Sequence, residues 1–377
     1  MSNEAKLKPN DIIKRSKNDY NWKVIVELGA GGFGTVNKVV QVNQNGVRIN
    51  SKEFAMKTEL KCISRQASRL KIEKNVMASY SKCDAQYRGH FPELIDIGQT
   101  ATEKWIVMTL VGASLENLKR KRPFSPSTAL QCSLQTLKAI HDFHQVGFLH
   151  RDIKPANCCI GAGENAEVVY LLDFGLARKY RMKNGVIRPP RPKTKMIGTP
   201  RYCPRASHRQ EELSRKDDFE SWLFMLFDFV DRENGVPWKG KPRDKAHEMK
   251  VRVFEEPNWI STVSSVPTKF IVMADYLNSL EYTSDVGFGI LRETITDYAR
   301  SLNLTLHERL DWTIPEDRDV TNTTTTTLTY SVDDNKSIGS EGSSDRERSQ
   351  SRKSRSRVSK SKKPLKTRKS MMTFEEK

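Results

Sequence analysis

Apolar and polar residues alternate over several short stretches in the first third of the chain, and such alternation is typical of half-buried strands. The predicted strands span residues 22–28, 36–42, 54–57, 94–97 and 105–111. Among them, a helical spacing predicts one helix, which carries Leu70, Glu73, Met77 and Tyr80 on a single face. The pattern therefore predicts a strand-rich part that includes one helix.

Beyond residue 112 the spacing of apolar residues becomes helical. A long helix is predicted to begin near Ser127, the expected N-cap, with Leu130, Leu134, Leu137, His141 and His144 along one stripe. The two histidines lack a third ligand nearby in the sequence, so we expect local hydrogen bonds rather than a metal site. Short strands are predicted at 158–160 and 168–172, a fully buried helix at 219–230, and further helices up to Leu304.

The composition changes at Pro315, where a run of threonines leads into a long stretch of Ser, Arg and Lys. Such a stretch offers too little apolar surface to offset the entropy of an ordered chain, so residues 316–377 are predicted to be disordered. We therefore expect a flexible leader at 1–21, a folded domain at 22–304, and a linker with a disordered basic tail at 305–377.

Positive charge is concentrated in the tail. The 377 residues include 64 Lys and Arg against 46 Asp and Glu, a net charge of +18, and 12 of these cations lie with a single Glu between Arg346 and Lys369. Such a segment attracts polyanions, so RNA, microtubules and acidic proteins are its expected partners. Three alternatives stay open: a nuclear localisation signal, a segment neutralised by phosphorylation, and a simple solubilising tail.

Several protein classes do not fit the sequence. The first 19 residues lack the apolar core of a secretory signal, and the longest apolar run, at 222–230, has nine residues that include one Asp. A membrane span needs about 20. The six cysteines form no CxxC pair, which argues against a zinc site or a disulfide framework. We expect a cytoplasmic monomer without a membrane span, with the nucleus as a second location through the tail.

A glycine-rich segment lies between the first two predicted strands. Residues 29–36 read Gly-Ala-Gly-Gly-Phe-Gly-Thr-Val and fit the pattern GxGxxGxV. Glycines let backbone N–H groups approach phosphate oxygens closely. Because a strand and not a helix follows, the segment does not fit a dinucleotide-binding turn. Taken alone, it predicts a phosphate-binding loop and an ordinary turn equally well.

One lysine and one glutamate are candidates for an ion pair beside this segment. Lys57 ends the predicted strand 54–57, and Glu73 lies on an otherwise apolar helix face. A carboxylate on such a face needs a cation, because its desolvation is costly. In one interpretation Glu73 aims Lys57 at nucleotide phosphates; in the other it is a surface residue at the margin of the stripe.

The most specific signal is a pair of motifs around the strand predicted at 168–172. The sequence His150-Arg151-Asp152-Ile153-Lys154-Pro155-Ala156-Asn157 precedes this strand, and Asp173-Phe174-Gly175 follows it directly. Phosphoryl transfer depends on positioning and charge neutralisation. Asp152 is the candidate to accept or orient a substrate hydroxyl, and Lys154 to meet the γ-phosphate. Asn157 and Asp173 are the candidates to supply the hard oxygen ligands that Mg²⁺ prefers.

Together these motifs resemble the eukaryotic protein kinase domain over residues 22–304. Lys154, two residues after Asp152, resembles the serine/threonine type. Residues 147–152, 172–178, 188–191, 198–202 and 215–218 are similar to the casein kinase I superfamily, particularly its tau-tubulin kinase-like branch. The resemblance implies an α+β, bilobal kinase fold with a small β-rich N-lobe and a larger helical C-lobe. It also implies an ATP- and Mg²⁺-dependent protein serine/threonine kinase.

The resemblance further implies a nucleotide site. Val36 and Ala55 would cover the adenine, and backbone groups of Thr109 and Val111 would bond its edge beside a gatekeeper, Met108. The residues expected to bind ATP are Leu28, Gly29, Ala30, Gly31, Gly32, Phe33, Gly34, Val36, Ala55, Lys57, Met108, Thr109, Val111 and Asp173, while Asp218 would brace the catalytic loop. Where the family reads Ser-Ile-Asn, this chain has Pro204-Arg205-Ala206, which leaves open how the substrate-side loop is anchored.

The loop after Asp173 is expected to influence which substrates bind and whether activity needs phosphorylation. Its basic residues include Arg178, Arg188, Arg191, Lys193, Lys195 and Arg201. In this family such residues favour acidic or pre-phosphorylated protein substrates; a solvated loop without preference is the alternative. Phosphorylation of Thr194 could order the loop through Arg151, yet the resemblance implies activity without that step, with a bound anion in its place. A kinase-fold scaffold or polyanion-binding protein without catalysis is the second hypothesis, although no catalytic part is missing.

Overall fold

The computed structural model describes residues 7–15, 19–31, 34–61, 68–256 and 258–313. Contacts divide the chain into residues 1–335 and 336–377, and the second unit lies wholly outside the described residues. The predicted disordered tail at 316–377 and two residues of the glycine-rich segment, Gly32 and Phe33, lie outside them as well. No described helix is long and apolar enough to cross a membrane.

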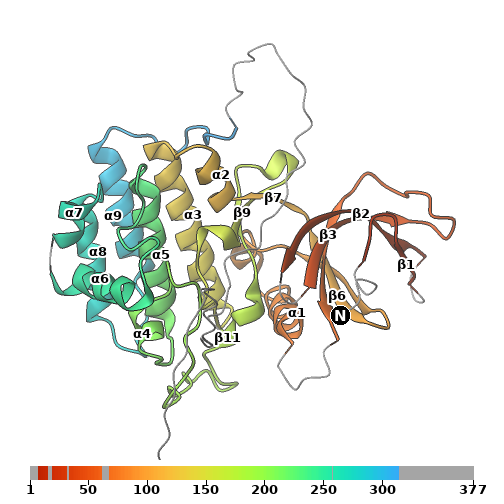
Figure 1. Ribbon diagram of the computed structural model, residues 1–377, viewed down its shortest axis with the longest axis horizontal. Coiled ribbons are helices and arrows are strands. Elements are labelled where there is room, and N and C mark those ends of the chain that lie inside the picture. Colours follow the sequence, from red (N-terminus) through yellow and green to blue (C-terminus); the bar gives the residue numbers. More distant parts are fainter. Residues whose placement is uncertain (1–6, 16–18, 32–33, 62–67, 257, 314–377) are drawn as a thin grey trace, which may run out of the picture. The chain divides into compact units, whose positions relative to one another are not determined.

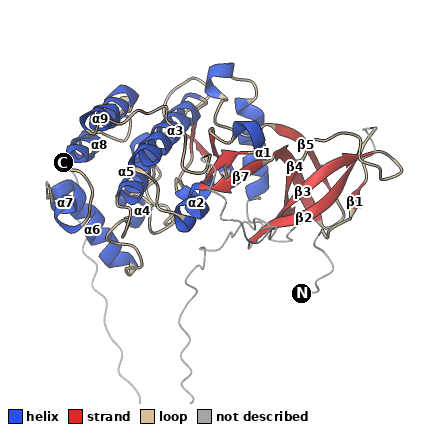
Figure 2. Cartoon of the chain, turned by 90° about the horizontal axis from the view of Figure 1, so that it is seen from above, coloured by secondary structure: helices blue, strands red, loops and turns tan. Residues whose placement is uncertain are grey.

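The N-terminal part is built around an antiparallel sheet (Figure 1). Its described strands follow the order β1-β2-β3-β4-β6-β5. The strands are β1 (Ile12–Ile13), β2 (Asn21–Gly31), β3 (Gly34–Val42), β4 (Phe54–Leu60), β5 (Leu94–Gln99) and β6 (Glu103–Thr109). Helix α1 (Arg69–Tyr80) packs on β4, β5 and β6 (Figure 2). The strands and the helix predicted here from alternation and helical spacing are confirmed.

The predicted flexible leader is wrong in part, because residues before position 22 join this sheet. Strand β1 pairs with β2, and Ile13 is buried. Arg15 ion-pairs with Asp96 of β5 at 2.8 Å, and its guanidinium lies 5.0 Å from the ring centre of Trp105. Two apolar residues are too few to show a period, so the sequence pattern did not predict this strand.

The C-terminal part is mainly helical. Its described helices are α2 (Leu115–Lys121), α3 (Pro126–Gln145), α4 (Arg205–His208), α5 (Arg215–Val230), α6 (Arg243–Glu255), α7 (Trp259–Val263), α8 (Ile271–Ser279) and α9 (Phe288–Ser301). Its short strands are β7 (Val111–Ser114), β8 (Phe148–Leu149), β9 (Cys158–Gly161), β10 (Val169–Leu171) and β11 (Arg178–Lys179). Helices α3 and α5 pack side by side (Figure 1), and the apolar residues of α5 are buried all round, as predicted. The α+β architecture, strand-rich before helical, is confirmed.

The N-cap of helix α3 is Ser125, two residues before the predicted cap at Ser127. The hydroxyl of Ser125 accepts the N–H of Thr128 at 3.2 Å, and Pro126 occupies the first helical position, which suits its fixed φ and missing N–H. The hydroxyl of Ser127 donates instead to the carbonyl of Thr305 at 3.1 Å. The predicted N-cap was therefore wrong.

The chain beyond residue 304, predicted to be a linker, packs onto the helical part as far as it is described. Leu310 is buried, and the carboxylate of Asp311 accepts the N–H of Ser125 at 2.6 Å. The indole N–H of Trp312 donates to the carbonyl of Ala166 at 2.9 Å. The Asp311 contact holds the N-cap residue of α3 from a distant part of the chain, and the folded part extends to residue 313.

Candidate active site

An ion-pair chain joins the strand-rich part to the helical part. The ammonium of Lys57, on β4, lies 2.8 Å from Glu73 of α1 and 3.0 Å from Asp173, two residues after the end of β10. Burial acts to lower the pKa of Lys57, but the carboxylates of Asp173 and Glu73 outweigh it and raise that pKa. Lys57 in turn holds the pKa of Asp173 well below its usual range, so this carboxylate is ionised. Of the two interpretations of Glu73, the structure favours the pair with Lys57.

Asp152 lies at the centre of a second cluster. Its Oδ1 accepts hydrogen bonds from the N–H and the hydroxyl of Thr199, both at 2.9 Å. Its Oδ2 lies 3.1 Å from the ammonium of Lys154, which also donates to the Thr199 hydroxyl at 2.9 Å. Thr199 therefore orients both predicted catalytic side chains. Sequence reasoning gave it no role, although it stands in one of the stretches that carry the family resemblance.

Asp218 of α5 supports the loop that carries Asp152. This carboxylate accepts the backbone N–H groups of His150 and Arg151, both at 2.8 Å, and lies 2.9 Å from Nε2 of His144. The loop needs this support because Arg151 adopts a left-handed backbone with φ of 69°. The bracing role expected of Asp218 fits these contacts, and His144 joins a local core network as expected.

Two residues could hold a cation beside these clusters. The amide nitrogen of Asn157 donates to the backbone carbonyl of Asp152 at 2.9 Å, which leaves its amide oxygen for a ligand. Asp173 is ionised, and its side chain is 45% exposed. Among the described residues no group of three or more His, Cys, Asp or Glu could hold a metal ion. Mg²⁺ typically takes one or two protein oxygens and completes its shell with phosphates and water, so this sparse set fits it.

The glycine-rich segment continues the ladder between β2 and β3. Gly29 pairs with Val36, and Gly31 pairs with Gly34. A Cβ at Gly34 would lie 1.9 Å from the carbonyl oxygen of Thr58, so only glycine allows β3 to approach β4 this closely. The predicted nucleotide residues Leu28, Gly29, Ala30 and Gly31 lie on β2, and Gly34 and Val36 on β3.

The residues predicted to meet the adenine lie on adjacent strands. Ala55 of β4 faces Met108 of β6 across the ladder, and Val36 pairs with Lys57. The N–H of Thr109 donates to the carbonyl of Glu93 at 3.1 Å, so this donor is already used. We therefore expect the carbonyl of Thr109, and not its N–H, to form the hydrogen bond to a nucleotide.

Comparison with known proteins agrees with this arrangement. Residues 22–284 match the family described as protein kinase domain. The chain belongs to the protein kinase family. It is 58% identical over 318 residues to the Caenorhabditis elegans protein "Putative serine/threonine-protein kinase ZK507.3", a match that covers 83% of this chain and 79% of the relative.

Two further C. elegans proteins resemble this kinase. It is 55% identical over 334 residues to "Putative serine/threonine-protein kinase ZK507.1", covering 86% of this chain and 99% of the relative. It is 31% identical over 223 residues to "Putative casein kinase I C03C10.2", covering 58% of this chain and 62% of the relative.

Two side chains outside the substrate-side loop anchor it in this kinase. Glu220 of α5 accepts the backbone N–H of Arg205 at 2.7 Å, and its two oxygens lie 3.1 and 3.2 Å from the guanidinium. Lys250 of α6, fully buried, donates to the carbonyls of Pro200 and Cys203 at 2.7 Å each. The departure at Pro204-Arg205-Ala206 therefore coincides with a well-anchored loop. The sequence gave no sign of either partner, because both lie far along the chain.

We call residues 174–204 the activation loop. Three of its six basic residues that were predicted to favour acidic substrates form ion pairs within the protein instead. Arg178 and Arg191 bond to Glu212, and Arg201 pairs with Asp228. Arg188, Lys193 and Lys195 are exposed, and among the described residues no acidic side chain pairs with them. Only part of the predicted basic surface is therefore available to a substrate.

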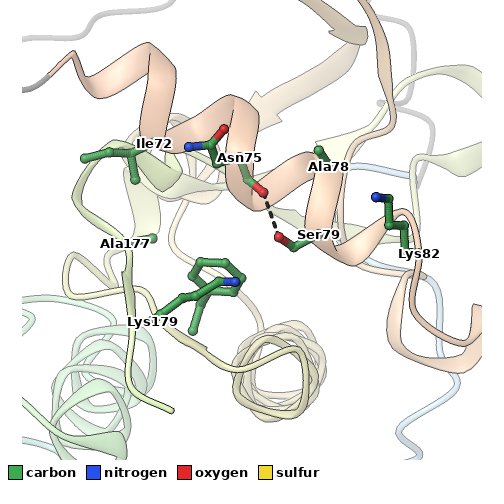
Figure 3. Close-up of a pocket in the computed structure, with 8 residues that line it drawn as sticks. Ile72, Asn75, Ala78, Ser79, Lys82, Ala177 and Lys179 are labelled. Carbon is green, nitrogen blue, oxygen red and sulfur yellow. Dashed lines mark hydrogen bonds between the residues drawn. The ribbon is translucent and has the colours of Figure 1, made fainter. Parts of the chain in front are cut away.

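A separate hollow of about 470 Å³ lies between α1 and strands β8 and β11 (Figure 3). Ile72, Asn75 and Ser79 line it from α1, Lys82 lines it from the turn that follows, and Ala177 and Lys179 line it from the activation loop. It shares no residue with the predicted nucleotide site. The face of α1 toward this hollow is therefore distinct from the one that carries Glu73.

Proposed function

We propose that this kinase transfers the γ-phosphoryl group of ATP to serine or threonine hydroxyls of acidic or pre-phosphorylated proteins, as a member of the casein kinase I superfamily close to its tau-tubulin kinase-like branch. The observation that carries the catalytic part is the cluster in which Thr199 orients Asp152 and Lys154. Lys154 two residues after Asp152 and the printed names of the relatives support the serine/threonine type. The 31% identity to a casein kinase I relative supports the superfamily.

The residues of the cleft divide the chemistry between them. Thr199 donates two hydrogen bonds of 2.9 Å to Oδ1 of Asp152, whereas the amide of Asn157 donates one longer bond, of 3.3 Å, to Oδ2. Oδ2 is therefore the atom that accepts the proton of the substrate hydroxyl while the hydroxyl oxygen bonds the γ-phosphorus and ADP leaves. Lys154, in contact with the same Oδ2, neutralises charge on the transferred group. Lys57, aimed by Glu73, holds the phosphates that are not transferred. Asn157 and Asp173 would hold Mg²⁺, which neutralises charge on the phosphates when bound.

The preference for acidic substrates rests on charge. Residues 174–210 include 11 Lys and Arg and no Asp or Glu. Internal acids neutralise several of them, and Arg188, Lys193 and Lys195 stay exposed. Replacing these three by Gln should raise KM for a peptide rich in Asp or phosphoserine and leave KM for a neutral peptide unchanged. Equal kcat/KM for the acidic and neutral peptides in the unmodified kinase would remove the preference.

The catalytic proposal is tested by phosphoryl transfer from labelled ATP to casein, with the full chain and Mg²⁺. Asp173→Asn should abolish transfer, because the metal loses its charged ligand. Asp297→Asn is the matched control, since Asp297 is exposed and pairs only with Arg300 in the described structure. Persistent transfer by Asp173→Asn would mean that the metal assignment is wrong. Absence of transfer by the unmodified kinase would favour the scaffold hypothesis.

We also propose that the basic tail binds polyanions and that the kinase is cytoplasmic, with the nucleus as a second location. The 12 cations between Arg346 and Lys369 support both ideas. The full chain should bind RNA or microtubules more tightly than a chain ending at residue 313. The ratio of the two affinities should fall about 10³-fold or more when salt rises from about 50 to about 200 mM. A difference that does not depend on salt would contradict electrostatic binding by the tail.

A further inference from the structure

Glu212 lies in the segment between α4 and α5, outside every motif of the phosphoryl-transfer site. Its side chain is buried. Both of its oxygens bond to the guanidinium of Arg191, with Oε1 at 3.0 Å from Nη2, and Oε1 lies 3.5 Å from Nε of Arg178. One carboxylate therefore joins two separate points of the activation loop.

A third guanidinium, that of Arg151, lies near enough to this carboxylate to be influenced by its charge. Burial lowers the pKa of Arg151 to about 10, and Glu212 is the foremost group that opposes this effect, while Arg178 and Arg191 add to it. The Nε of Arg151 donates to the carbonyl of Leu176 at 2.8 Å. Arg151, next to Asp152 in the chain, thus links the catalytic loop to the first turn of the activation loop.

Three arginines from distant points of the chain would repel one another without an anion among them. The activation loop cannot supply one from its own side chains, since residues 174–210 contain no Asp or Glu. A phosphorylated Thr194 does not supply one in this arrangement either. The Thr194 hydroxyl is buried and donates to the carbonyls of Gln210 and Glu211 at 3.1 and 2.9 Å.

We infer that Glu212 is a built-in anion that holds Arg178 and Arg191 together and so keeps the start of the activation loop, where Arg151 bonds to Leu176, in its active arrangement. Glu212 is a positioning residue, because it holds Arg178 beside the segment to which Arg151 bonds and touches no reacting atom. The inference rests on the proposed kinase function and adds to it a residue that positions the activation loop.

The experiment compares phosphatase-treated full-length kinase with Glu212→Gln, Glu212→Ala and the control Glu211→Gln, whose carboxylate is exposed and pairs with Arg209. Glu212→Gln should lower kcat about tenfold or more and change KM for ATP less than about twofold. Glu212→Ala leaves space for a small anion. Acetate or phosphate should therefore restore its kcat by about fivefold or more over chloride at equal ionic strength. Glu211→Gln should behave as the unmodified kinase.

Amide hydrogen exchange over residues 176–195, measured without nucleotide, separates this inference from the kinase function itself. Exchange there should be faster in Glu212→Gln than in the unmodified chain, whether or not either protein transfers phosphate. If Glu212→Ala does not fold, the swap Glu212→Arg with Arg191→Glu should restore protection lost in Glu212→Arg alone. The inference is overturned by unchanged kcat and exchange in Glu212→Gln, or by rescue no greater than with chloride.

Discussion

Glu220 receives three hydrogen bonds from Arg205, one from the backbone N–H and two from the guanidinium. The two side chains are 5% and 13% exposed, so they form a largely buried ion pair. The pair fixes the start of α4 against α5, where the activation loop ends.

We expect Glu220→Gln to lower the free energy of unfolding by about 2–4 kcal/mol, because it leaves a buried guanidinium without its charge partner. Urea unfolding measures this loss. Glu211→Gln, at an exposed pair with Arg209, should cost less than about 1 kcal/mol. Equal losses in both variants would show that the burial of Glu220 does not matter.

Glu73→Gln should weaken the positioning of Lys57, because the variant loses the ion pair at 2.8 Å on the apolar side of α1. We expect kcat/KM for ATP to fall about 10–100-fold, as for a charged hydrogen bond of about 1.5–3 kcal/mol. Steady-state kinetics at varied ATP measures it. Glu53→Gln, which breaks the more exposed pair with Lys38, is the control and should leave kcat/KM as it is.

Thr199→Val removes a hydroxyl that bonds both Asp152 and Lys154, while the backbone N–H to Asp152 stays. We expect kcat to fall about tenfold and KM for ATP to change little, because the hydroxyl orients the reacting groups and not the nucleotide. Thr199→Ser keeps the hydroxyl and should retain most of the activity. A Ser variant as slow as the Val variant would mean that the methyl group matters instead.

His208 should make the kinase less stable in acid. Burial, together with nearby Lys250, lowers the pKa of His208 to about 3, against 6.5 for the ordinary side chain. Below pH 6.5 the unfolded chain therefore binds a proton at His208 that the folded chain does not bind. The free energy of unfolding falls as pH falls from 6.5 toward 3. Urea unfolding at about pH 7.5 and 5 should show a smaller difference for His208→Gln than for the unmodified kinase. His307→Gln, at an exposed histidine, is the control and should leave this difference unchanged.

Local pattern predicted much of the fold. Alternation gave β2 to β6, helical spacing gave α1 and α3, and the all-apolar run gave α5, because each period depends only on neighbours in the chain. The cap of α3 was misplaced by two residues, since both Ser125 and Ser127 stand beside Pro126 and only the backbone geometry distinguishes them. Strand β1 was missed because two residues carry no period.

The site was predicted where its chemistry is written in contiguous motifs, as for Asp152 and Asp173. What the sequence could not show is pairing between distant residues of ordinary type. Glu212 lies 61 positions after Arg151, and Lys250 lies 47 after Cys203. A basic loop also looked uniformly available in the sequence, whereas internal carboxylates occupy several of its guanidinium groups.

Lys250 donates hydrogen bonds to two main-chain oxygens of the activation loop, those of Pro200 and Cys203. Every residue type has such a carbonyl, so this contact places no demand on which side chains stand at those two positions. Pro200 is exposed whereas Cys203 is buried, so relatives that keep the lysine can diverge at position 200, altering what the loop presents to a polypeptide while its path stays fixed. Substrate preference can therefore change through the exposed side chains of this loop while the contacts that anchor the loop stay the same.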